Sequence, residues 1–405
     1  MTNGRNRSDM KCEFKRVAFL SALVVTFVSL SLFAMQNQTL HVVYMKSWND
    51  EDYVSNISRQ NVTSIRSELL NASVLQNEMP RPATCTRQEN VVYIKTHKTG
   101  STTIQSILYR YGFARNLSFV VRKTNPHNGH IRYMKVTKDS PRKMFLPLLA
   151  AGDECSFRGY NMSAIHVVHD RSVFETFMNP GTKYITILRN PVTQLLSAFV
   201  FFNLGKRTTG NTSEIKLSNY MKGSSWKRSP YGRNSQSKDL GLARDAFDNE
   251  TQIENFINRL NKELDLVLIH EYFEESVVLF SREFCWKLKD LAYTVQNNRS
   301  KQKPAISPKL LEKIRIFNHA DFRLYDHFNK TFWKRVEEQG PGFWRDLREF
   351  KKLQNETMYR CFKTSNIPEG YVPGTNISNY CDRYYGGLFL FKNIYKKQKK
   401  NCTQT

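Results

Sequence analysis

Short apolar runs alternate with longer segments of helical periodicity over most of this 405-residue chain. Runs bounded by polar turns and rich in β-branched residues predict buried strands at Val91–Ile94, Ala164–Val168, Tyr184–Leu188 and Leu266–Ile269. Helical patterns follow at about 101–111, at about 191–202 and through Phe280, and the chain beyond about Pro308 is mainly helical in pattern. Strands that alternate with helices predict an α/β fold with a central, mostly parallel sheet flanked by helices.

The pattern near the N-terminus is different. Residues Val17 to Met35 carry no charge and are long enough to cross a bilayer as a helix. Basic residues precede this run, and the first acidic residue after it is Asp50, so the rest of the chain is expected in the lumen or outside the cell. A cleaved signal peptide is the alternative, but the run is long for one and ends in a poor cleavage site.

These boundaries predict four regions. Residues 1–16 form a cytoplasmic tail, 17–35 an uncleaved signal-anchor, 36–84 a lumenal stem and 85–405 the catalytic domain. The stem is polar, carries several Asn-x-Ser/Thr triplets and ends in Met79-Pro80-Arg81-Pro82, as expected of a spacer between a membrane and a folded domain.

Glycosylation triplets and cysteines support the lumenal assignment. Asn-x-Ser/Thr triplets recur from Asn37 to Asn401. Cys12 would be cytoplasmic, and the remaining cysteines could form disulfides whose pairing the sequence leaves open; these are Cys85, Cys155, Cys285, Cys361, Cys381 and Cys402. Because no two of them are spaced as CxxC, a zinc site is not expected.

Composition narrows the class of protein. Hydrophobic residues make up 40% of the chain, enough to bury a core, which excludes a wholly disordered protein. The 61 Lys and Arg residues against 36 Asp and Glu residues give a net charge of +25, which indicates an anionic partner. A lumenal location argues against nucleic acid, so a membrane surface or a small phosphate or sulfate compound is expected.

The first candidate anion site follows the strand Val91–Ile94. A polar turn and the start of a helix come next, as Lys95-Thr96-His97-Lys98-Thr99-Gly100-Ser101-Thr102-Thr103. A strand–turn–helix gathers free backbone N–H groups at the positive end of the helix dipole. The lysine precedes the glycine, so this is not a Walker A loop. An ordinary Ser/Thr-rich helix start is the alternative interpretation.

A second segment strengthens the anion hypothesis. The strand Tyr184–Leu188 leads into Arg189-Asn190-Pro191, and Ser197 lies eight residues after Arg189. An arginine at a strand end, with a serine two turns into the next helix, could grip a second phosphate. Taken alone, Arg189 would be a surface ion-pair partner and Ser197 a small packing residue.

These segments resemble a known family. Lys98-Thr99-Gly100-Ser101-Thr102 resembles the 5′-phosphosulfate loop of sulfotransferases, and Arg189 with Ser197 resembles their 3′-phosphate motif. Lys95–Thr99 is similar to the galactose-3-O-sulfotransferases, which include galactosylceramide sulfotransferase. Similar segments continue to about Cys361, at Glu271–Ser276, Cys285–Trp286, Gln296–Ser300 and Leu324–Asn329.

The resemblance implies a P-loop-like sulfotransferase fold and the donor 3′-phosphoadenylyl sulfate (PAPS). Lys98 would neutralise the charge that develops on the oxygen bridging sulfur and phosphorus. The donor-binding residues would be Lys98, Thr99, Gly100, Ser101, Thr102, Thr103, Arg189 and Ser197. No metal is required by this scheme.

The base that deprotonates the acceptor is expected to be a histidine, since its ordinary pKa near 6.5 suits this task. The first candidate is His169, because Val168-His169-Asp170-Arg171 resembles the family's His-x-Arg segment. That segment typically reads His-His-Met-Arg-Phe, and Val168 and Asp170 depart from it here. His97 and His166 are rivals that could instead contact the acceptor, Arg171 could orient the acceptor, and Glu271 is a carboxylate alternative.

The resemblance implies transfer of a sulfuryl group to a hydroxyl, that at position 3, of a terminal β-galactose. The acceptor could be a glycolipid or a glycoprotein glycan, and the enzyme would be a single-pass type II Golgi membrane protein whose oligomeric state stays open. A Golgi glycosyltransferase is one alternative, but its Asp-x-Asp motif occurs here only as Asp50-Glu51-Asp52, in the stem. A non-catalytic binder of sulfated glycans is another, supported by the basic charge.

Overall fold

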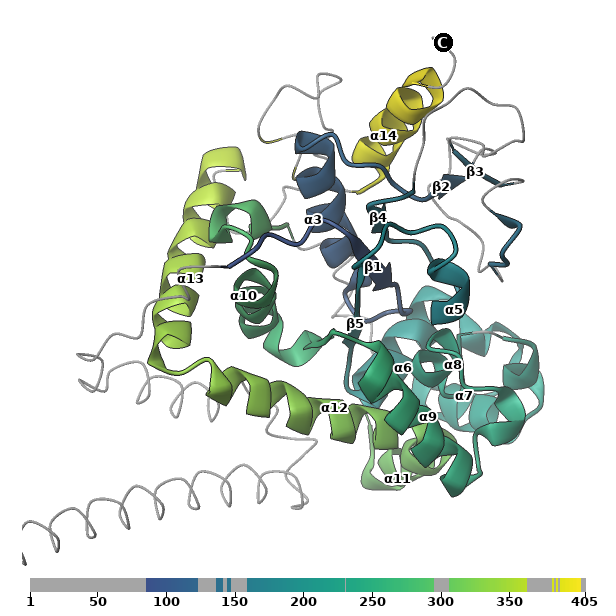
Figure 1. Cartoon of the computed structure of the whole chain (residues 1–405). Helices are drawn as coiled ribbons and strands as arrows, with labels where there is room; N and C mark the ends of the chain where they lie inside the picture. The colour runs from purple at the N-terminus through teal and green to yellow at the C-terminus, as the bar shows by residue number, and fades with distance from the viewer. Residues whose placement is uncertain are drawn as a thin grey trace, which may run out of the picture. The chain divides into compact units, whose positions relative to one another are not determined.

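The structure is a computed structural model, and the residues that it describes are 85–122, 136–140, 144–146, 159–229, 231–294, 306–362, 381, 384 and 387–401 (Figure 1). They all fall within one unit, Ala72–Thr405. The expected tail, anchor and stem lie outside the described residues. Within the described part of the chain, no helix has the length and apolar character needed to span a bilayer.

A parallel sheet is the centre of the fold. Its strands, in the order in which they pair, are β4 (Met162–Ser163), β1 (Val91–Ile94), β5 (Lys183–Leu188) and β6 (Leu266–Ile269). Each pair is parallel, so all carboxyl ends meet at one edge. The chain goes from β1 to β4 on one side and returns to form β5 on the other. Such a reversal is where open α/β sheets bind their ligands.

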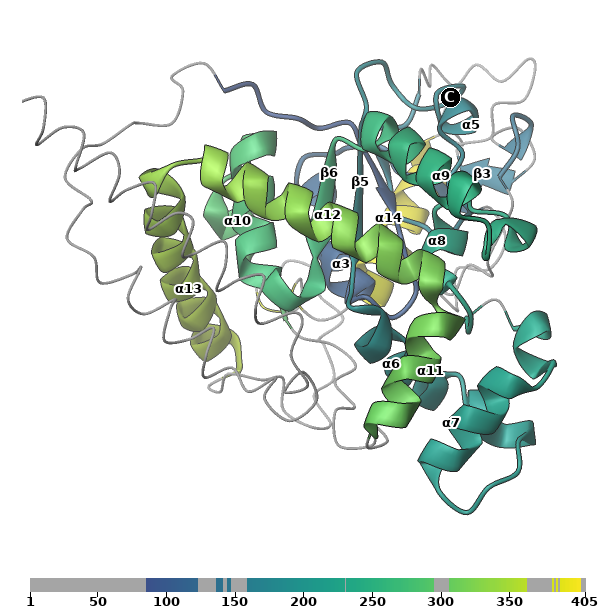
Figure 2. The same ribbon diagram turned by 90° about the horizontal axis from the view of Figure 1, so that it is seen from below.

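Helices pack around this sheet and confirm the predicted α/β fold. α10 (Phe273–Phe284) and α12 (His319–Glu338) contact β6, and α14 (Gly387–Asn401) packs along α3 (Ser101–Ala114), as Figures 1 and 2 allow the reader to follow. α13 (Pro341–Phe362) packs on α10. The mainly helical pattern predicted beyond Pro308 is therefore confirmed for the described residues.

The remaining elements are short or peripheral. The helices are α5 (Arg171–Phe174), α6 (Pro191–Phe201), α7 (Ser213–Lys222), α8 (Ser235–Asp239), α9 (Glu250–Glu263) and α11 (Pro308–Phe317). Single 3-10 turns lie at Leu204–Arg207, Ser225–Arg228, Arg244–Ala246, His270–Tyr272 and Leu288–Leu291. β2 (Val121–Arg122) and β3 (Phe145–Leu146) form a separate antiparallel pair.

One predicted strand is displaced. The apolar run Ala164–Val168 predicted a strand, but β4 is Met162–Ser163, just before it. The carbonyl of Ala164 accepts hydrogen bonds from the Gln105 and Tyr109 side chains of α3. Side chains of α3 therefore bind the carbonyl at the position where β4 would continue, and the strand ends at Ser163.

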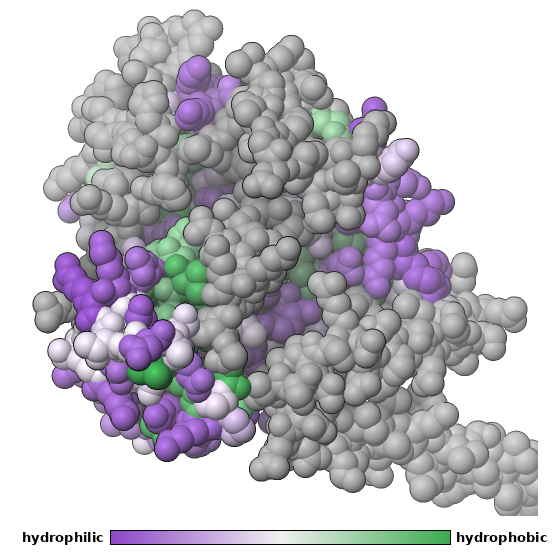
Figure 3. Space-filling model, turned by 180° about the vertical axis from the view of Figure 1, so that it is seen from behind, coloured by the Kyte–Doolittle hydropathy of each residue, from purple (hydrophilic) through white to green (hydrophobic). Residues whose placement is uncertain are grey.

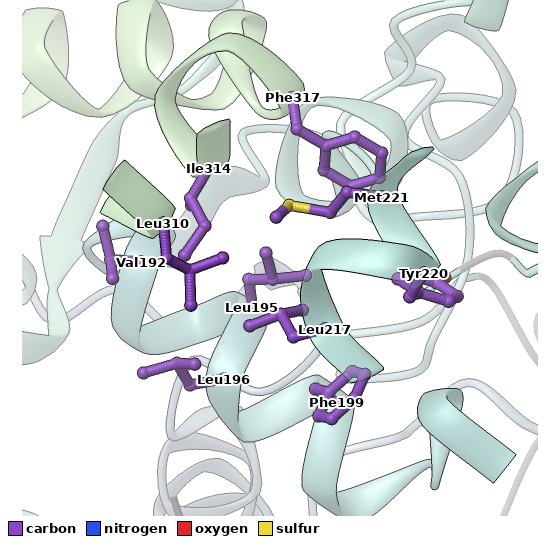
Figure 4. Close-up of a cluster of buried hydrophobic side chains, with 10 residues drawn as sticks. All are labelled: Val192, Leu195, Leu196, Phe199, Leu217, Tyr220, Met221, Leu310, Ile314 and Phe317. Atoms are coloured by element: carbon purple, nitrogen blue, oxygen red, sulfur yellow. The ribbon is translucent and has the colours of Figure 1, made fainter. Parts of the chain in front are cut away.

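An apolar cluster fixes the position of α6. It joins one face of α6 to α7 and α11 (Figure 4), and its members are Val192, Leu195, Leu196, Phe199, Leu217, Tyr220, Met221, Leu310, Ile314 and Phe317. Asn190 caps α6 by accepting from the N–H groups of Val192 and Thr193, and Pro191 occupies its first turn. The opposite, partly exposed face of α6 carries Thr193 and Ser197.

Two disulfides lie among the described cysteines. Cys85 pairs with Cys285 at the end of α10, and Cys361 in α13 pairs with Cys381. Cys155 and Cys402 lie outside the described residues. The expectation of disulfides is therefore confirmed, and two pairings are assigned.

Seen from behind, the described residues are mostly hydrophilic, with a few apolar side chains among them (Figure 3).

Candidate active site

The turn between β1 and α3, Lys95–Gly100, is called the β1 turn below. Its backbone is left-handed at Lys98 (φ 62°) and at Gly100 (φ 79°). The Thr96 hydroxyl donates to the Ile187 carbonyl of β5 over 2.7 Å and lies 2.7 Å from the Thr99 hydroxyl. These bonds fasten the β1 turn to the neighbouring strand.

The N-terminus of α3 suits an anion. Gly100 is the N-cap, and no described side chain caps the helix there. The first backbone N–H groups of an α-helix have no partner within the helix, and the helix dipole is positive at this end. A Cβ atom at Gly100 would lie 2.6 Å from Nδ1 of His270, just after β6. Glycine is therefore required here for its backbone angle and for its lack of a side chain.

The hydroxyl-bearing residues of this segment face mostly inward. Thr99 is fully buried, Ser101 and Thr103 are buried, and Thr102 is partly exposed. Thr99 also donates to the Thr96 carbonyl over 3.3 Å. The Thr99 hydroxyl therefore stabilises the turn, and Thr102 is the most exposed of these four residues.

The two lysines of the β1 turn have different surroundings. The Nζ atom of Lys98 lies 3.5 Å from the ring centroid of Phe201, at the end of α6, and that ring is 39% exposed. Lys95 is buried, and its Nζ donates to Oε1 of Gln105 over 2.8 Å. Burial, with a smaller effect of the Lys98 charge, lowers the pKa of Lys95 to about 7.

Arg189, after β5, lies against the β1 turn. Its Nη1 donates to the Lys98 carbonyl over 3.1 Å, and its Nε donates to the Thr193 hydroxyl over 2.9 Å. Burial lowers the pKa of Arg189, the Glu271 charge opposes this, and the guanidinium stays cationic. Ser197 lies one helical turn beyond Thr193 on α6. The structure therefore brings together the two predicted segments.

Glu271, after β6, holds the neighbouring strand end. Its carboxylate accepts from the Asn190 N–H over 3.1 Å and from the Tyr325 hydroxyl over 3.1 Å. Desolvation by the surrounding protein raises the pKa of Glu271, while the Arg189 charge and these hydrogen bonds lower it. Glu271 keeps exposed surface, so its desolvation is incomplete. Glu271, the carboxylate alternative for the base, therefore binds the main chain of Asn190.

His97 is paired with the buried carboxylate of Asp239. The His97 N–H donates to Oδ2 of Asp239 over 2.8 Å, and the ring Nδ1 lies 2.7 Å from the same oxygen. A carboxylate oxygen accepts, so Nδ1 carries the proton and the basic lone pair is on Nε2. The His166 ring stacks on that of His97 with centroids 4.0 Å apart, and its Nδ1 lies 2.8 Å from the Lys95 carbonyl.

His169 belongs to a separate cluster around Glu263. Its Nε2 lies 2.8 Å from Oε2 of Glu263, and its side chain has no exposed surface. The lone pair is therefore on Nδ1, which is buried and has no hydrogen-bond partner among the described residues. Arg171 donates to the Glu263 carbonyl and to the Glu175 carboxylate. Both side chains are thus engaged by Glu263, and Arg171 also by Glu175.

Four side chains that contact or lie beside these groups have no counterpart in the sequence predictions: Asp239, Gln236, Thr193 and His270. Thr193 could have been found, because a residue four positions after Arg189 faces it if a helix starts there. Asp239 lies 142 positions from His97, and Gln236 lies 47 from Arg189. A single sequence carries no signal for such distant pairs.

These features define a class of protein. At one edge of the parallel sheet lie the uncapped N-terminus of α3, Lys98 and Arg189, together with His97, whose ring is oriented by the Asp239 carboxylate. An anion site beside an oriented base is what an enzyme that transfers a phosphate-like or sulfate group requires. Within the described residues, no group of three or more His, Cys, Asp or Glu side chains could hold a metal ion.

Comparison with known proteins gives the family. The family model described as Galactose-3-O-sulfotransferase matches residues 23–377. Galactose-3-O-sulfotransferase 3 of Bos taurus is 31% identical over 306 residues, which are 72% of this chain and 67% of the relative. Galactosylceramide sulfotransferase of Bos taurus is 30% identical over 286 residues, 68% of this chain and 64% of the relative. The chain belongs to the galactose-3-O-sulfotransferase family.

Gly100→Ala tests the β1 turn. We expect it to weaken binding of adenosine 3′,5′-bisphosphate (PAP) at least 10-fold by calorimetry, because the new methyl group clashes with His270 next to the helix N-terminus. Gly181→Ala is the matched control, since Gly181 has a similar φ of 73° and nothing within 4 Å of its added Cβ. It should lose stability to backbone strain and keep PAP affinity. Equal losses of affinity in both variants would contradict this interpretation.

Lys95→Met tests the buried lysine through the pH dependence of stability. In the wild type, the penalty for burying the ammonium is full below about pH 7 and disappears as the pH rises toward 10.5, because the folded state loses its proton first. The stability advantage of Lys95→Met should therefore shrink by up to about 1.4 kcal/mol per pH unit over this window.

Urea unfolding at several pH values between 6.5 and 10 measures this difference. Lys309→Met is the control, since Lys309 is exposed on α11. Its stability difference from the wild type should not follow the same curve. A Lys95→Met difference that is independent of pH would show that Lys95 is protonated in the folded protein throughout.

Proposed function

We propose that this protein transfers the sulfuryl group of PAPS to the 3-hydroxyl of a terminal β-galactose on a glycolipid or glycoprotein glycan. The observation that supports this most is the contact between the two predicted donor segments, in which Arg189 donates to the Lys98 carbonyl over 3.1 Å. Membership of the galactose-3-O-sulfotransferase family supports the donor and the sugar. The relatives include enzymes named for galactosylceramide and for galactose, so both kinds of acceptor stay within the proposal.

The donor is PAPS in this proposal, bound by a P-loop-like sulfotransferase fold. Its 5′-phosphosulfate would lie at the uncapped N-terminus of α3, with backbone N–H groups and Thr102 as donors. Arg189 and Ser197 would hold the 3′-phosphate. As the sulfur–oxygen bond breaks, negative charge develops on the leaving phosphate, and Lys98 would neutralise it.

His97 is the base that the geometry favours. Its Nδ1–H points to Asp239, which places the basic lone pair on Nε2, and His97 directly precedes Lys98 in the β1 turn. The acceptor hydroxyl would give its proton to Nε2 as its oxygen attacks sulfur. His169, the first candidate from the sequence, stays a prediction. In this structure its basic nitrogen is buried against the Glu263 cluster. His166 would support the His97 ring by stacking.

The cellular setting is also a proposal. The uncharged run 17–35 with basic residues before it, the polar stem 36–84 and the recurring Asn-x-Ser/Thr triplets support a type II Golgi membrane protein with its catalytic domain, 85–405, in the lumen. Disulfides at Cys85–Cys285 and Cys361–Cys381 are consistent with an oxidising compartment.

Lys98→Ala tests the function. Wild-type protein should transfer radiolabelled sulfate from PAPS to galactosylceramide, lactosylceramide or a galactose-terminated glycan, with linkage analysis of the product. Lys98→Ala should lower kcat at least 100-fold, because the leaving phosphate loses its neutralising cation. Lys309→Ala removes an exposed lysine of α11 and should keep full activity. Full activity of Lys98→Ala would rule out this donor site.

Paired histidine variants test the base. His97→Ala should lower kcat at least 100-fold and leave PAP affinity within about threefold, since the base contacts the acceptor and not the donor phosphates. His169→Gln keeps a polar group that can donate to Glu263 and should retain most of the activity. The reverse pattern, with His169→Gln inactive and His97→Ala active, would restore His169 as the base.

A further inference from the structure

The short helix α8, Ser235–Asp239, is polar and lies in the interior. Four of its five residues have no exposed surface: Ser235, Gln236, Ser237 and Asp239. Buried polar groups are costly unless they are hydrogen-bonded, so the partners of this helix show what it is for.

One end of α8 is anchored to α12. The Asp321 carboxylate accepts from the Gln236 N–H over 3.2 Å and from the Ser237 N–H and hydroxyl, each over 2.7 Å. In return, the Asp321 N–H donates to the Asn234 side chain over 3.1 Å. The two helix N-termini therefore cap each other, which gives α8 a fixed position.

Gln236 holds the main chain at the end of β5. Its Oε1 accepts from the Arg189 N–H over 2.8 Å, and its Nε2 donates to the Arg189 carbonyl over 2.8 Å. A single side chain thus satisfies both main-chain groups of Arg189, in the way that a neighbouring strand would. The position from which the guanidinium extends is set by α8.

Asp239 holds the β1 turn in a similar way. Its Oδ2 accepts from the His97 N–H and from the His97 ring. Its Oδ1 has no hydrogen-bond partner among the described residues. Within that part of the chain, the Asp239 carboxylate therefore binds His97 through Oδ2. Gln194 of α6 adds a link, because its Nε2 donates to the His97 carbonyl over 2.8 Å and to the Ser235 hydroxyl over 2.7 Å.

We propose that α8 sets the spacing between the two halves of the active site, with Gln236 and Asp239 as positioning residues for different steps of the reaction. Gln236 positions Arg189 and so acts on donor binding. Asp239 orients the His97 ring and so acts on proton removal from the acceptor. The inference rests on the proposed function, and it assigns separate roles to two residues one helical turn apart.

The test compares Gln236→Ala with Asp239→Asn in the purified full chain. Gln236→Ala should weaken PAP binding about 10- to 30-fold by calorimetry, since two hydrogen bonds to Arg189 are lost. Asp239→Asn keeps an acceptor for the His97 N–H but loses the charge beside Nδ1. It should lower kcat about 10- to 100-fold and change PAP affinity less than threefold. If Gln236→Ala does not fold, Gln236→Glu replaces it, because it keeps the acceptor for the Arg189 N–H.

Ser237→Ala is the matched control on the same helix. It loses the hydroxyl bond to Asp321 and touches neither donor segment. It should lower Tm while PAP affinity and kcat stay within twofold of the wild type. A helix with a merely structural role would instead make all three variants lose Tm, affinity and kcat together, which would overturn the inference.

A double-mutant cycle tests whether Asp239 acts through His97. Asp239→Asn should cause no further loss of kcat in a His97→Asn background, because the ring that it orients is gone. A further loss of the full size would contradict the inference. Wild-type protein that neither binds PAP nor transfers sulfate would overturn the proposed function together with the inference. A wild type that does both, with the same parameter lost in both α8 variants, would overturn the inference alone.

Discussion

The active site depends on the hydrogen bonds that fasten the β1 turn to the end of β5. The Thr96 hydroxyl donates to the Ile187 carbonyl, and the Arg189 guanidinium donates to the Lys98 carbonyl. Because β1 and β5 are parallel neighbours in register, their carboxyl ends lie side by side, and these bonds convert that proximity into a fixed spacing. The proposed donor, PAPS, carries phosphate at two ends and would need such a spacing, because one cation would meet each end.

This arrangement places several charged and polar groups where solvent is largely excluded. Lys95 has a pKa lowered to about 7 by burial, and burial raises the pKa of Asp321 to about 6. Neither group is part of the proposed chemistry, and both lie in the network that supports it. Burying these two groups lowers the stability of the fold, and their contacts hold the site in place. Such a cost is common where a fold must hold reactive groups in position. The apolar cluster behind α6 is one source of compensating stability.

The sequence was most informative about local structure. The strands β1, β5 and β6 and the helices that follow them could be predicted, because apolar runs and polar turns are local signals. Ala164–Val168 was misassigned, since side chains of α3 bind there in place of a strand. Lys98 and Arg189 could be singled out by motif. The roles of Gln236 and Asp239 could not, because their partners are distant in sequence, and burial of His169 against Glu263 depends on the position of α9.

The Cys85–Cys285 disulfide has a topological consequence. It joins positions 200 apart, and the loop it closes contains β1, β4, β5 and β6, together with the β1 turn, Arg189 and α8. In the chain-entropy description, closing such a loop lowers the conformational entropy of the unfolded chain and so raises its free energy by about 5 kcal/mol. It also means that a protease cut at any single bond between these two cysteines leaves the pieces covalently joined. Exposed loops inside this ring can therefore be nicked without releasing either half of the active site.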